Sequence, residues 1–323
     1  MMKVRMLTLL DILHEKTDEE HVLNSQALLA ELQKKGMTSD RRSIYRDVEA
    51  LAEYGFDVVT TAKGFYLRNR RFSLAEIMLM ISAVQAAPFV TESKTQALMD
   101  KLLGFLSEYQ RDGIRSASNI SGVKFSNEEV YRTIEMINYG IASGRKVSFL
   151  YYKRSIMRRD VVQRKGRRYV VSPYAMVWVQ DRYYLISNMN GKEGMTHFRL
   201  DRIRDVRLED TKAKPVNKVE GFAKGFDASD YASKCLNMFG GDIKRITLRC
   251  HMDLINELFD RFGDDIPVKK DGEEHFIARI EAAASKGFIN WVCQFGDKAE
   301  VLEPAELRAE VGEYLKSAAA LYE

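Results

Sequence analysis

The sequence predicts a multidomain α+β protein, and three observations support this prediction. Helical periodicity leads into a short β-rich hairpin within residues 1–71, five short β-rich segments separated by turn residues lie between residues 146 and 203, and mixed helix and strand patterns return from residue 241. With 323 residues, of which 46% are hydrophobic, the chain is long enough for two or three domains with buried cores. The parts that we expect are a winged helix-turn-helix (1–71), a helical connector (72–127), a small β-barrel domain (128–210), a linker (211–240) and a small α/β domain (241–323).

Two helices are predicted at the N-terminus. The first spans residues 3–16, and its inner face is expected to consist of Met6, Leu7, Leu10 and Leu13. The second spans residues 26–35, because Asn24 and Ser25 are favourable N-cap residues and Gly36 ends the periodic run.

A third helix is expected to begin near Ser39, after a turn of only a few residues, as a helix-turn-helix requires. Ile44, Val48 and Leu51 recur at helical spacing and form its inner stripe. Gly55 can adopt the positive φ that ends a helix. Two β-rich runs around a turn at residues 62–64 then indicate the hairpin of a winged helix-turn-helix.

The outer side of this third helix carries cations that suit DNA, because arginine can contact a guanine base or pair with a phosphate. The residues that we expect to contact DNA are Ser39, Arg41, Arg42, Ser43, Tyr45 and Arg46 of the helix and Lys63 at the hairpin tip. The alternative is a solvated helix face, since charged residues are common on the outer side of helices. The helix-turn-helix pattern as a whole favours DNA.

Positive charge is concentrated in the middle of the chain. Residues 140–210 contain 16 Lys and Arg against seven Asp and Glu, whereas the whole chain has a net charge of +4. Such a surplus favours an anionic partner, most commonly nucleic acid. Tyrosines are interleaved with the arginines, a combination that binds single-stranded nucleic acid or nucleotides by pairing phosphates and stacking bases. Alternatively, the arginines form the solvated face of half-buried strands and the tyrosines belong to the core.

Several other classes of function are disfavoured. Cys235, Cys250 and Cys293 are widely spaced and form no CxxC pair, which argues against a disulfide scaffold or a zinc site and for the cytoplasm. The sequence has no GxGxxG, Walker, GxSxG or HExxH motif, so we expect no enzyme, no cofactor and no bound metal. The most apolar run, residues 77–90, is too short to span a membrane.

Several motifs, in their order along the chain, resemble the bacterial WYL-domain transcriptional regulators, which begin with a DeoR-type winged helix-turn-helix. DRRSIYRDVEAL (40–51) resembles the recognition-helix signature of that family, and GFYL (64–67) resembles the hairpin after it. YVVSPYAMVWVQDRYYLIS (169–187) resembles the core of the WYL domain, with tyrosine replacing the tryptophan of the eponymous tripeptide. HFRLDRI (197–203) resembles the strand that closes this motif, and FGDKAEVLEPAELRAEV (295–311) resembles the C-terminal extension.

This resemblance implies a sequence-specific transcriptional regulator that binds an operator in double-stranded DNA as a homodimer held by the C-terminal extension. It implies an Sm-like, SH3-type barrel that senses an anionic effector, with single-stranded nucleic acid or a nucleotide as the proposed ligand. The residues that it places on the effector surface are Tyr152, Arg182, Tyr184, His197, Arg199 and Arg202. Many members have an arginine where this chain has Thr196, so a phosphate contact is either lost or replaced by His197. The alternative function is an accessory module that binds RNA or single strands and acts through a protein partner.

Overall fold

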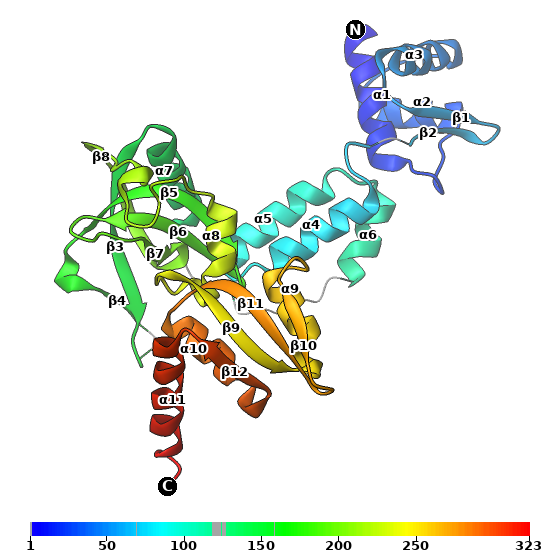
Figure 1. The fold of residues 1–323 in the computed structure, drawn as a ribbon. Coiled ribbons are helices and arrows are strands. Elements are labelled where there is room, and N and C mark those ends of the chain that lie inside the picture. Colours follow the sequence, from blue (N-terminus) through cyan, green and yellow to red (C-terminus); the bar gives the residue numbers. More distant parts are fainter. Residues whose placement is uncertain (1, 69, 118–123, 125–126, 158) are drawn as a thin grey trace. The chain divides into compact units, whose positions relative to one another are not determined.

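The computed structural model describes residues 2–68, 70–117, 124, 127–157 and 159–323, and Figure 1 shows the order of the elements. The chain divides into two compact units, residues 1–126 and 127–323. The first unit is mainly helical and contains one hairpin, whereas the second contains two antiparallel sheets with helices.

Three helices open the first unit: α1 (Met2–Lys16), α2 (Ser25–Lys34) and α3 (Arg41–Tyr54). The side chain of Asn24 caps α2 by accepting from the Ala27 amide at 2.9 Å, and Asp40 caps α3 by accepting from the Ser43 amide at 3.0 Å. Gly55 ends α3 in the left-handed region at φ 111°. The three predicted helices are therefore confirmed.

The inner face of α1 differs from the prediction at one position. Leu9, Ile12 and Leu13 are fully buried in the core of this part, whereas Leu7 is 58% exposed. Residues 6–13 contain so many apolar side chains that two neighbouring faces fit a helical period equally well. The predicted inner face is therefore rotated about the helix axis relative to the face that packs in the core.

The hairpin consists of β1 (Val58–Thr61) and β2 (Gly64–Leu67), as predicted. A third segment pairs with it, because the Leu23 amide donates to the Phe65 carbonyl at 3.0 Å and the Phe65 amide donates back at 2.8 Å. Gly64 allows this close approach: a Cβ there would lie 2.4 Å from the Leu23 carbonyl oxygen.

Three further helices complete the first unit: α4 (Leu74–Ala86), α5 (Glu92–Leu103) and α6 (Glu108–Ala117). Ser73 and Glu76 form a capping box at the start of α4. The Ser107 hydroxyl before α6 donates to Asp18 Oδ2 at 2.6 Å, which joins α6 to the end of α1. Helix α6 extends to Ala117, and most of the rest of the expected connector (118–123 and 125–126) lies outside the described residues.

The second unit begins with α7 (Val130–Ala142) and a six-stranded antiparallel half-barrel sheet. Its strands are β3 (Arg145–Arg154), β4 (Asp160–Val162), β5 (Tyr169–Val179), β6 (Arg182–Met189), β7 (Thr196–Arg199) and β8 (Ile203–Lys212). Five of the strands follow the order β4-β3-β5-β6-β7, and the sixth, β8, pairs with β3. Ile137 of α7 packs onto Phe149, Leu185 and Phe198 in the core of the sheet. A closed, Sm-like barrel remains a prediction.

The predicted strand at residues 197–203 is two strands joined by the 3-10 turn η2 (Leu200–Arg202). The second of them, β8, was missed because its apolar alternation is broken by a bulge, where Asp205 has a φ of 49°. The buried Asn127 side chain supports the start of β8, since its amide donates to the Ile203 carbonyl at 3.1 Å.

The segment 211–240, expected to be a linker, is packed instead. It contains the end of β8, helix α8 (Ala228–Lys234) and the 3-10 turn η4 (Leu236–Met238). Tyr231, Cys235 and Met238 are buried in one cluster with Tyr184 of β6 and Ala283 of the C-terminal sheet. The polar residues of this segment suggested a linker, but its spaced apolar side chains pack against the two sheets.

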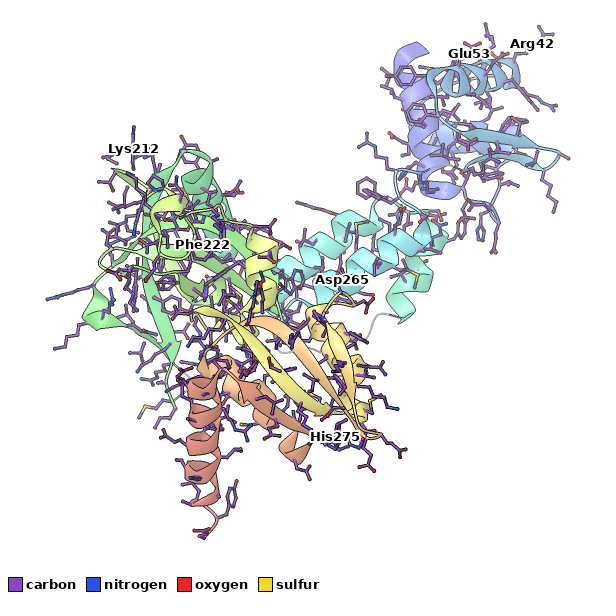
Figure 2. The ribbon with its side chains drawn as sticks, in the orientation of Figure 1. Arg42, Glu53, Lys212, Phe222, Asp265 and His275 are labelled. Atoms are coloured by element: carbon purple, nitrogen blue, oxygen red, sulfur yellow. The ribbon has the colours of Figure 1, made fainter. Side chains whose placement is uncertain are left out.

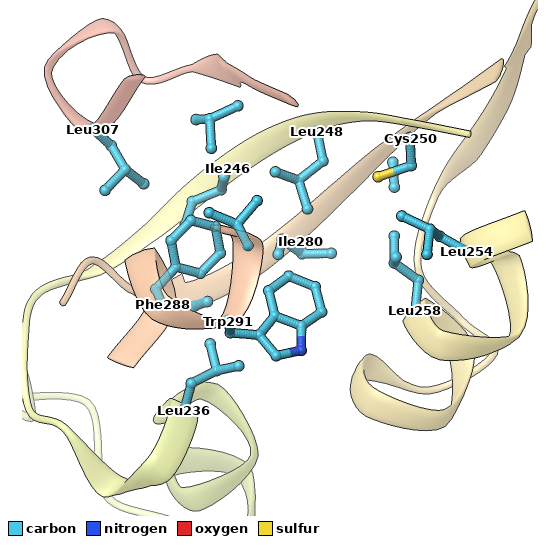
Figure 3. Close-up of a cluster of buried hydrophobic side chains, with 14 of the residues drawn as sticks. Leu236, Ile246, Leu248, Cys250, Leu254, Leu258, Ile280, Phe288, Trp291 and Leu307 are labelled. Carbon is cyan, nitrogen blue, oxygen red and sulfur yellow. The ribbon is translucent and has the colours of Figure 1, made fainter. Parts of the chain in front are cut away.

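The C-terminal part contains a four-stranded antiparallel sheet with the order β10-β11-β9-β12. Its strands are β9 (Ile243–His251), β10 (Val268–Asp271), β11 (His275–Ala283) and β12 (Ala299–Glu303), and its helices are α9 (Ile255–Phe262), α10 (Lys286–Cys293) and α11 (Ala305–Ala319). Leu248, Phe288 and Trp291 lie in its core (Figure 3). The sequence did not predict β10 or β12; β10 is a charged, exposed edge strand without apolar alternation.

Candidate nucleic-acid interface and effector surface

The outer side of α3 is the first candidate interface. Arg41, Arg42, Tyr45 and Arg46 are exposed there, and Figure 2 labels Arg42 near the start of the helix. The Arg41 guanidinium lies 5.8 Å from the centre of the Tyr45 ring. Within the described chain, none of these arginines forms an ion pair with a carboxylate, so their charges are available to an anionic partner.

A partly buried ion pair fixes the inner side of the same helix. Arg5 of α1 donates Nε to Asp47 Oδ2 at 2.8 Å and Nη2 to Asp47 Oδ1 at 3.0 Å. The hydrogen bond to Asp47 raises the pKa of Arg5, so the pair stays ionised. This two-point contact limits rotation of α3 about its axis and thereby orients its arginine side.

Ser43 does not lie on that outer side, which corrects the prediction. The side chain is only 3% exposed, its hydroxyl donates to Asp40 Oδ2 at 2.9 Å, and it accepts from Arg46 Nη2 at 3.2 Å. Ser43 lies on the buried side of α3 with Ile44 and Asp47, where it completes the helix cap and contacts Arg46. Ser39 is half-buried before the helix, and Lys63 is exposed at the hairpin tip.

The predicted effector residues fall into two groups. Tyr184 of β6 pairs directly with Arg199 of β7, and Ile186 pairs with His197, so these four side chains share one face of the sheet. That face is opposite to the side that packs on α7, because Leu185 and Phe198 between them point into the core. Arg182 lies two residues before Tyr184 on the same face and is exposed.

This face is covered by the chain itself, so the expected open effector surface is not found there. The Tyr184 side chain is only 8% exposed beneath the segment of α8 and η4. His197 Nδ1 donates to the Met238 carbonyl at 2.7 Å, and His197 Nε2 lies 3.0 Å from the Tyr231 hydroxyl. Burial lowers the pKa of His197 and therefore favours its neutral form.

Arg199 is also engaged within the chain. Its guanidinium donates to both carboxylate oxygens of Asp201, at 3.0 and 2.9 Å. The second group lies at the β3–β8 edge, where the Arg204 guanidinium lies 5.9 Å from the centre of the Tyr152 ring. Arg202 belongs to η2 beside this edge and is half-buried. The structure thus brings Tyr184, His197 and Arg199 together and places Tyr152 with Arg204 instead.

Ion pairing divides the many cations of the sheet domain into two classes. Arginines that pair with an aspartate are Arg145, Arg168, Arg199, Arg204 and Arg207. Several exposed cations form no ion pair within the described chain, and five of them lie close together in the sequence: Lys153, Arg154, Arg159, Lys165 and Arg167. The latter belong to β3, to the loop before β4 and to the turn around η1 (Arg164–Gly166), and we call them the basic hairpin patch. Arg158, part of the same charge run, lies outside the described residues.

Most of the interleaved aromatic residues belong to the core, as the alternative interpretation expected. Phe149 stacks on Tyr169 with ring centres 5.9 Å apart and meets Phe198 edge-on at 5.0 Å. Tyr151 meets Phe198 edge-on at 5.2 Å. These rings hold the sheet together and are not available to stack bases, which leaves Tyr152 as the half-exposed aromatic residue nearest the basic hairpin patch.

The remaining candidate chemistry is limited in the described part of the chain. Burial raises the pKa of the Cys235 and Cys250 thiols to about 11, so neither is a reactive thiolate near neutral pH. The Thr196 hydroxyl, at the position of the family arginine, is buried without a hydrogen-bond partner there. Within the described residues, no cluster of three or more His, Cys, Asp or Glu could hold a metal ion. Among the same residues, no helix is both long enough and apolar enough to cross a membrane.

Two solved structures align with most or all of this chain. The chain aligns over its full length with proteasome accessory factor B/C (PafBC) of Arthrobacter aurescens, at 18% identity and a TM-score of 0.29, but it spans only 49% of that protein. A CRISPR Cas-related protein aligns with 91% of this chain and 77% of its own, at 12% identity and a TM-score of 0.37. Both TM-scores are below 0.5, so these alignments support no functional argument, and comparison with curated proteins gives no match.

Two family models match the second unit. One describes the WYL domain and covers residues 132–208, which span most of α7 and the six-stranded sheet. The other describes the WCX domain and covers residues 244–319, which correspond to the C-terminal sheet and its helices. The protein therefore contains a WYL domain followed by a WCX domain.

Proposed function

We propose that this protein is a sequence-specific, DNA-binding transcriptional regulator whose WYL domain binds an anionic effector. Residues 1–71 act as a DeoR-type winged helix-turn-helix, with α3 in the major groove and the hairpin tip at a phosphate or in the minor groove. The protein works as a homodimer on a pseudo-palindromic operator, because a symmetric dimer favours a symmetric site. Effector binding changes operator affinity through unequal affinity for two arrangements of the dimer.

The observation that carries this proposal is the outer side of α3. Arg41, Arg42 and Arg46 are exposed, form no ion pair with a carboxylate within the described chain and lie on a helix that Arg5 and Asp47 orient. A helix of 14 residues that follows α2 after a short turn matches the element that enters the major groove in helix-turn-helix proteins.

The effector part of the proposal rests on the basic hairpin patch. Its five cations are exposed and have no carboxylate partner within the described chain, so they can neutralise phosphates without first breaking ion pairs. The face with Tyr184 and His197 is covered by α8 and η4, and an effector would reach it only after these elements moved. The patch also supports the second candidate, an accessory module that binds RNA or single strands.

Selection of genomic duplex fragments by the purified protein, followed by footprinting, tests the DNA-binding function. We expect a discrete protected site with two related half-sites. Arg42→Ala and Arg46→Ala should each weaken binding to that site by roughly 1–3 kcal/mol, about tenfold or more, because each removes a base or phosphate contact.

Lys101→Ala is the matched control, because Lys101 is an exposed cation on α5 of the same unit. It should leave operator affinity unchanged, and circular dichroism should show that all three variants remain folded. Undiminished operator binding by both arginine variants at about physiological salt would refute the role of α3. Binding of single strands without any discrete duplex site would favour the accessory module.

A further inference from the structure

A cavity of about 480 Å³ lies beside the core of the WCX domain, at the turn between β5 and β6. Small-ligand sites commonly have volumes of about 300–1,000 Å³, so its size suits one small molecule. It is lined by residues of the β5–β6 turn, η4, α9 and α10, and these are Gln180, Asn237, Glu257, Asp260, Arg261, Asn290, Trp291 and Gln294. None of them belongs to α3, to the basic hairpin patch or to the predicted effector residues.

Arg261 is the unusual residue of this cavity. Its Nε and Nη2 atoms are buried and have no hydrogen-bond partner within the described chain. Glu257 lies four residues earlier on α9, a spacing at which glutamate and arginine often pair, yet no ion pair joins them in the described structure. The guanidinium carbon of Arg261 lies 5.7 Å from the centre of the Phe262 ring, and burial lowers the pKa of Arg261.

Buried donors in proteins almost always have an acceptor. Arg261 lines the cavity and has two donors that lack an acceptor, and because these atoms have no open surface in the ligand-free protein, an acceptor from outside the chain reaches them only when the wall of the cavity shifts. A carboxylate is the natural candidate, because its two oxygens match the fork of the guanidinium. The phosphate groups of a nucleic acid fit less well, since Glu257 and Asp260 line the same cavity and repel additional negative charge.

The other lining groups define the rest of the ligand. Glu257 and Asp260 can bind an ammonium group, while the amides of Gln180, Asn237 and Asn290 can donate to and accept from polar atoms. The Trp291 ring contributes an apolar surface in a cavity that is otherwise polar. We propose that this cavity binds a small zwitterion with one carboxylate and one ammonium group, the chemistry of a free amino acid.

Thermal unfolding of the full chain with each standard amino acid at millimolar concentration tests this proposal. We expect at least one amino acid to raise the unfolding temperature, and isothermal titration then measures its affinity. The corresponding decarboxylated amine and the N-acetyl derivative should each bind at least tenfold more weakly, since one lacks the carboxylate and the other the ammonium group.

Arg261→Met separates ligand binding from a structural role. It keeps a flexible apolar side chain against Phe262 but removes the unpartnered donors, so the ligand-free protein should unfold at the same or a higher temperature. The shift caused by the amino acid should be lost. Arg279→Met is the control, because Arg279 is an exposed arginine of the same domain, and it should keep the full shift.

Three results would overturn the proposal. In the first, no amino acid stabilises the wild-type protein. In the second, Arg261→Met lowers the unfolding temperature of the ligand-free protein and leaves amino-acid binding intact, as a purely structural arginine would. In the third, nucleoside monophosphates stabilise the protein through Arg261 while amino acids do not, which would assign the cavity to a nucleotide.

Discussion

At the scale of single residues, His197 shows how neighbours decide the role of a side chain. The resemblance to the WYL-domain regulators placed it on the surface for an anionic effector. In the structure, both ring nitrogens are used by the segment that covers the sheet, because Nδ1 contacts the Met238 carbonyl and Nε2 contacts the Tyr231 hydroxyl. The carbonyl can only accept, so the neutral ring carries its proton on Nδ1 and accepts from Tyr231 through Nε2.

This arrangement predicts that acid weakens the attachment of α8 to the sheet. Burial lowers the pKa of His197 in the folded protein, so the unfolded chain takes up the proton first. The stabilising contribution is therefore complete above the ordinary histidine pKa of about 6.5 and is lost as pH falls below it.

Urea unfolding followed by tryptophan fluorescence between about pH 5 and 7.5 measures this effect. The two tryptophans, Trp178 and Trp291, both belong to the second unit, so the signal excludes His14 in the first unit, whose pKa burial also lowers. His197→Gln cannot titrate and should flatten the pH dependence. An equal slope in this variant and the wild type would contradict the assignment.

At the scale of elements, the hairpin β1–β2 owes its position to one glycine. Gly64 lies at a φ of 148° beside Leu23, whose backbone pairs with Phe65 as a short third strand. A hairpin of two strands alone is marginally stable in water, so the Leu23 segment and the buried side chains of Phe65 and Leu67 stabilise it. The exposed tip with Lys63 therefore extends from a fixed base.

Gly64→Ala should release this hairpin from the Leu23 segment. Its Cβ would lie 2.4 Å from the Leu23 carbonyl oxygen, a contact that only a backbone shift can relieve. We expect a loss of roughly 1–3 kcal/mol in stability and faster hydrogen exchange at the amides of Leu23 and Phe65.

Gly113→Ala is the matched control, because nothing lies within 4 Å of a Cβ at this position of α6. It should be neutral or stabilising by about 0.5–1 kcal/mol, as expected for a glycine in a helix interior. Lys63→Ala should leave exchange unchanged and weaken only DNA binding. Unaltered exchange in Gly64→Ala would show that the base of the hairpin is not held in this way.

At the scale of the whole molecule, exposed cations lie on α3 in the first unit and on the basic hairpin patch in the second. Residues 140–210 have a net charge of +9, and five of their arginines pair with aspartates of the same segment. The exposed cations of this segment that form no ion pair in the described structure include the basic hairpin patch, while α3 in the other unit carries its own separate cations. The protein therefore has two cationic surfaces that can be tested independently.

Lys165→Ala combined with Arg167→Ala should weaken binding of a fluorescent oligothymidylate without affecting a duplex operator. Loss of two phosphate contacts should also reduce the slope of log K against log salt by about 1.4, because each contact on a single strand contributes about 0.7. Fluorescence anisotropy at several salt concentrations measures both quantities.

Lys269→Ala combined with Lys270→Ala removes the same charge from exposed positions of β10 in the WCX domain and should change neither the affinity nor the slope. If both double variants lose affinity equally, the attraction depends on net charge alone and the patch is not a binding surface.

Much of the fold could be predicted because local signals agree with the packing. Asp40, Gly55 and the apolar stripe between them specify α3 almost completely. Contacts between distant residues could not be predicted in this way. Only the structure distinguishes Arg204, paired with Asp160 across 44 positions, from Lys165, which has no such partner in the described chain. Ser43 and Arg261 were misplaced or overlooked for the same reason, since burial by other segments decides their roles.

The covering segment of α8 and η4 connects the two sheets of the second unit. Tyr231, Cys235 and Met238 pack in one cluster with Tyr184 and Ala283, and therefore with both sheets. The WYL and WCX domains match separate family models, but they share this hydrophobic cluster and are not independent modules. A WYL domain produced without the WCX domain would expose the apolar side chains that this cluster buries. Substitutions in one domain at this contact therefore require matching substitutions in the other.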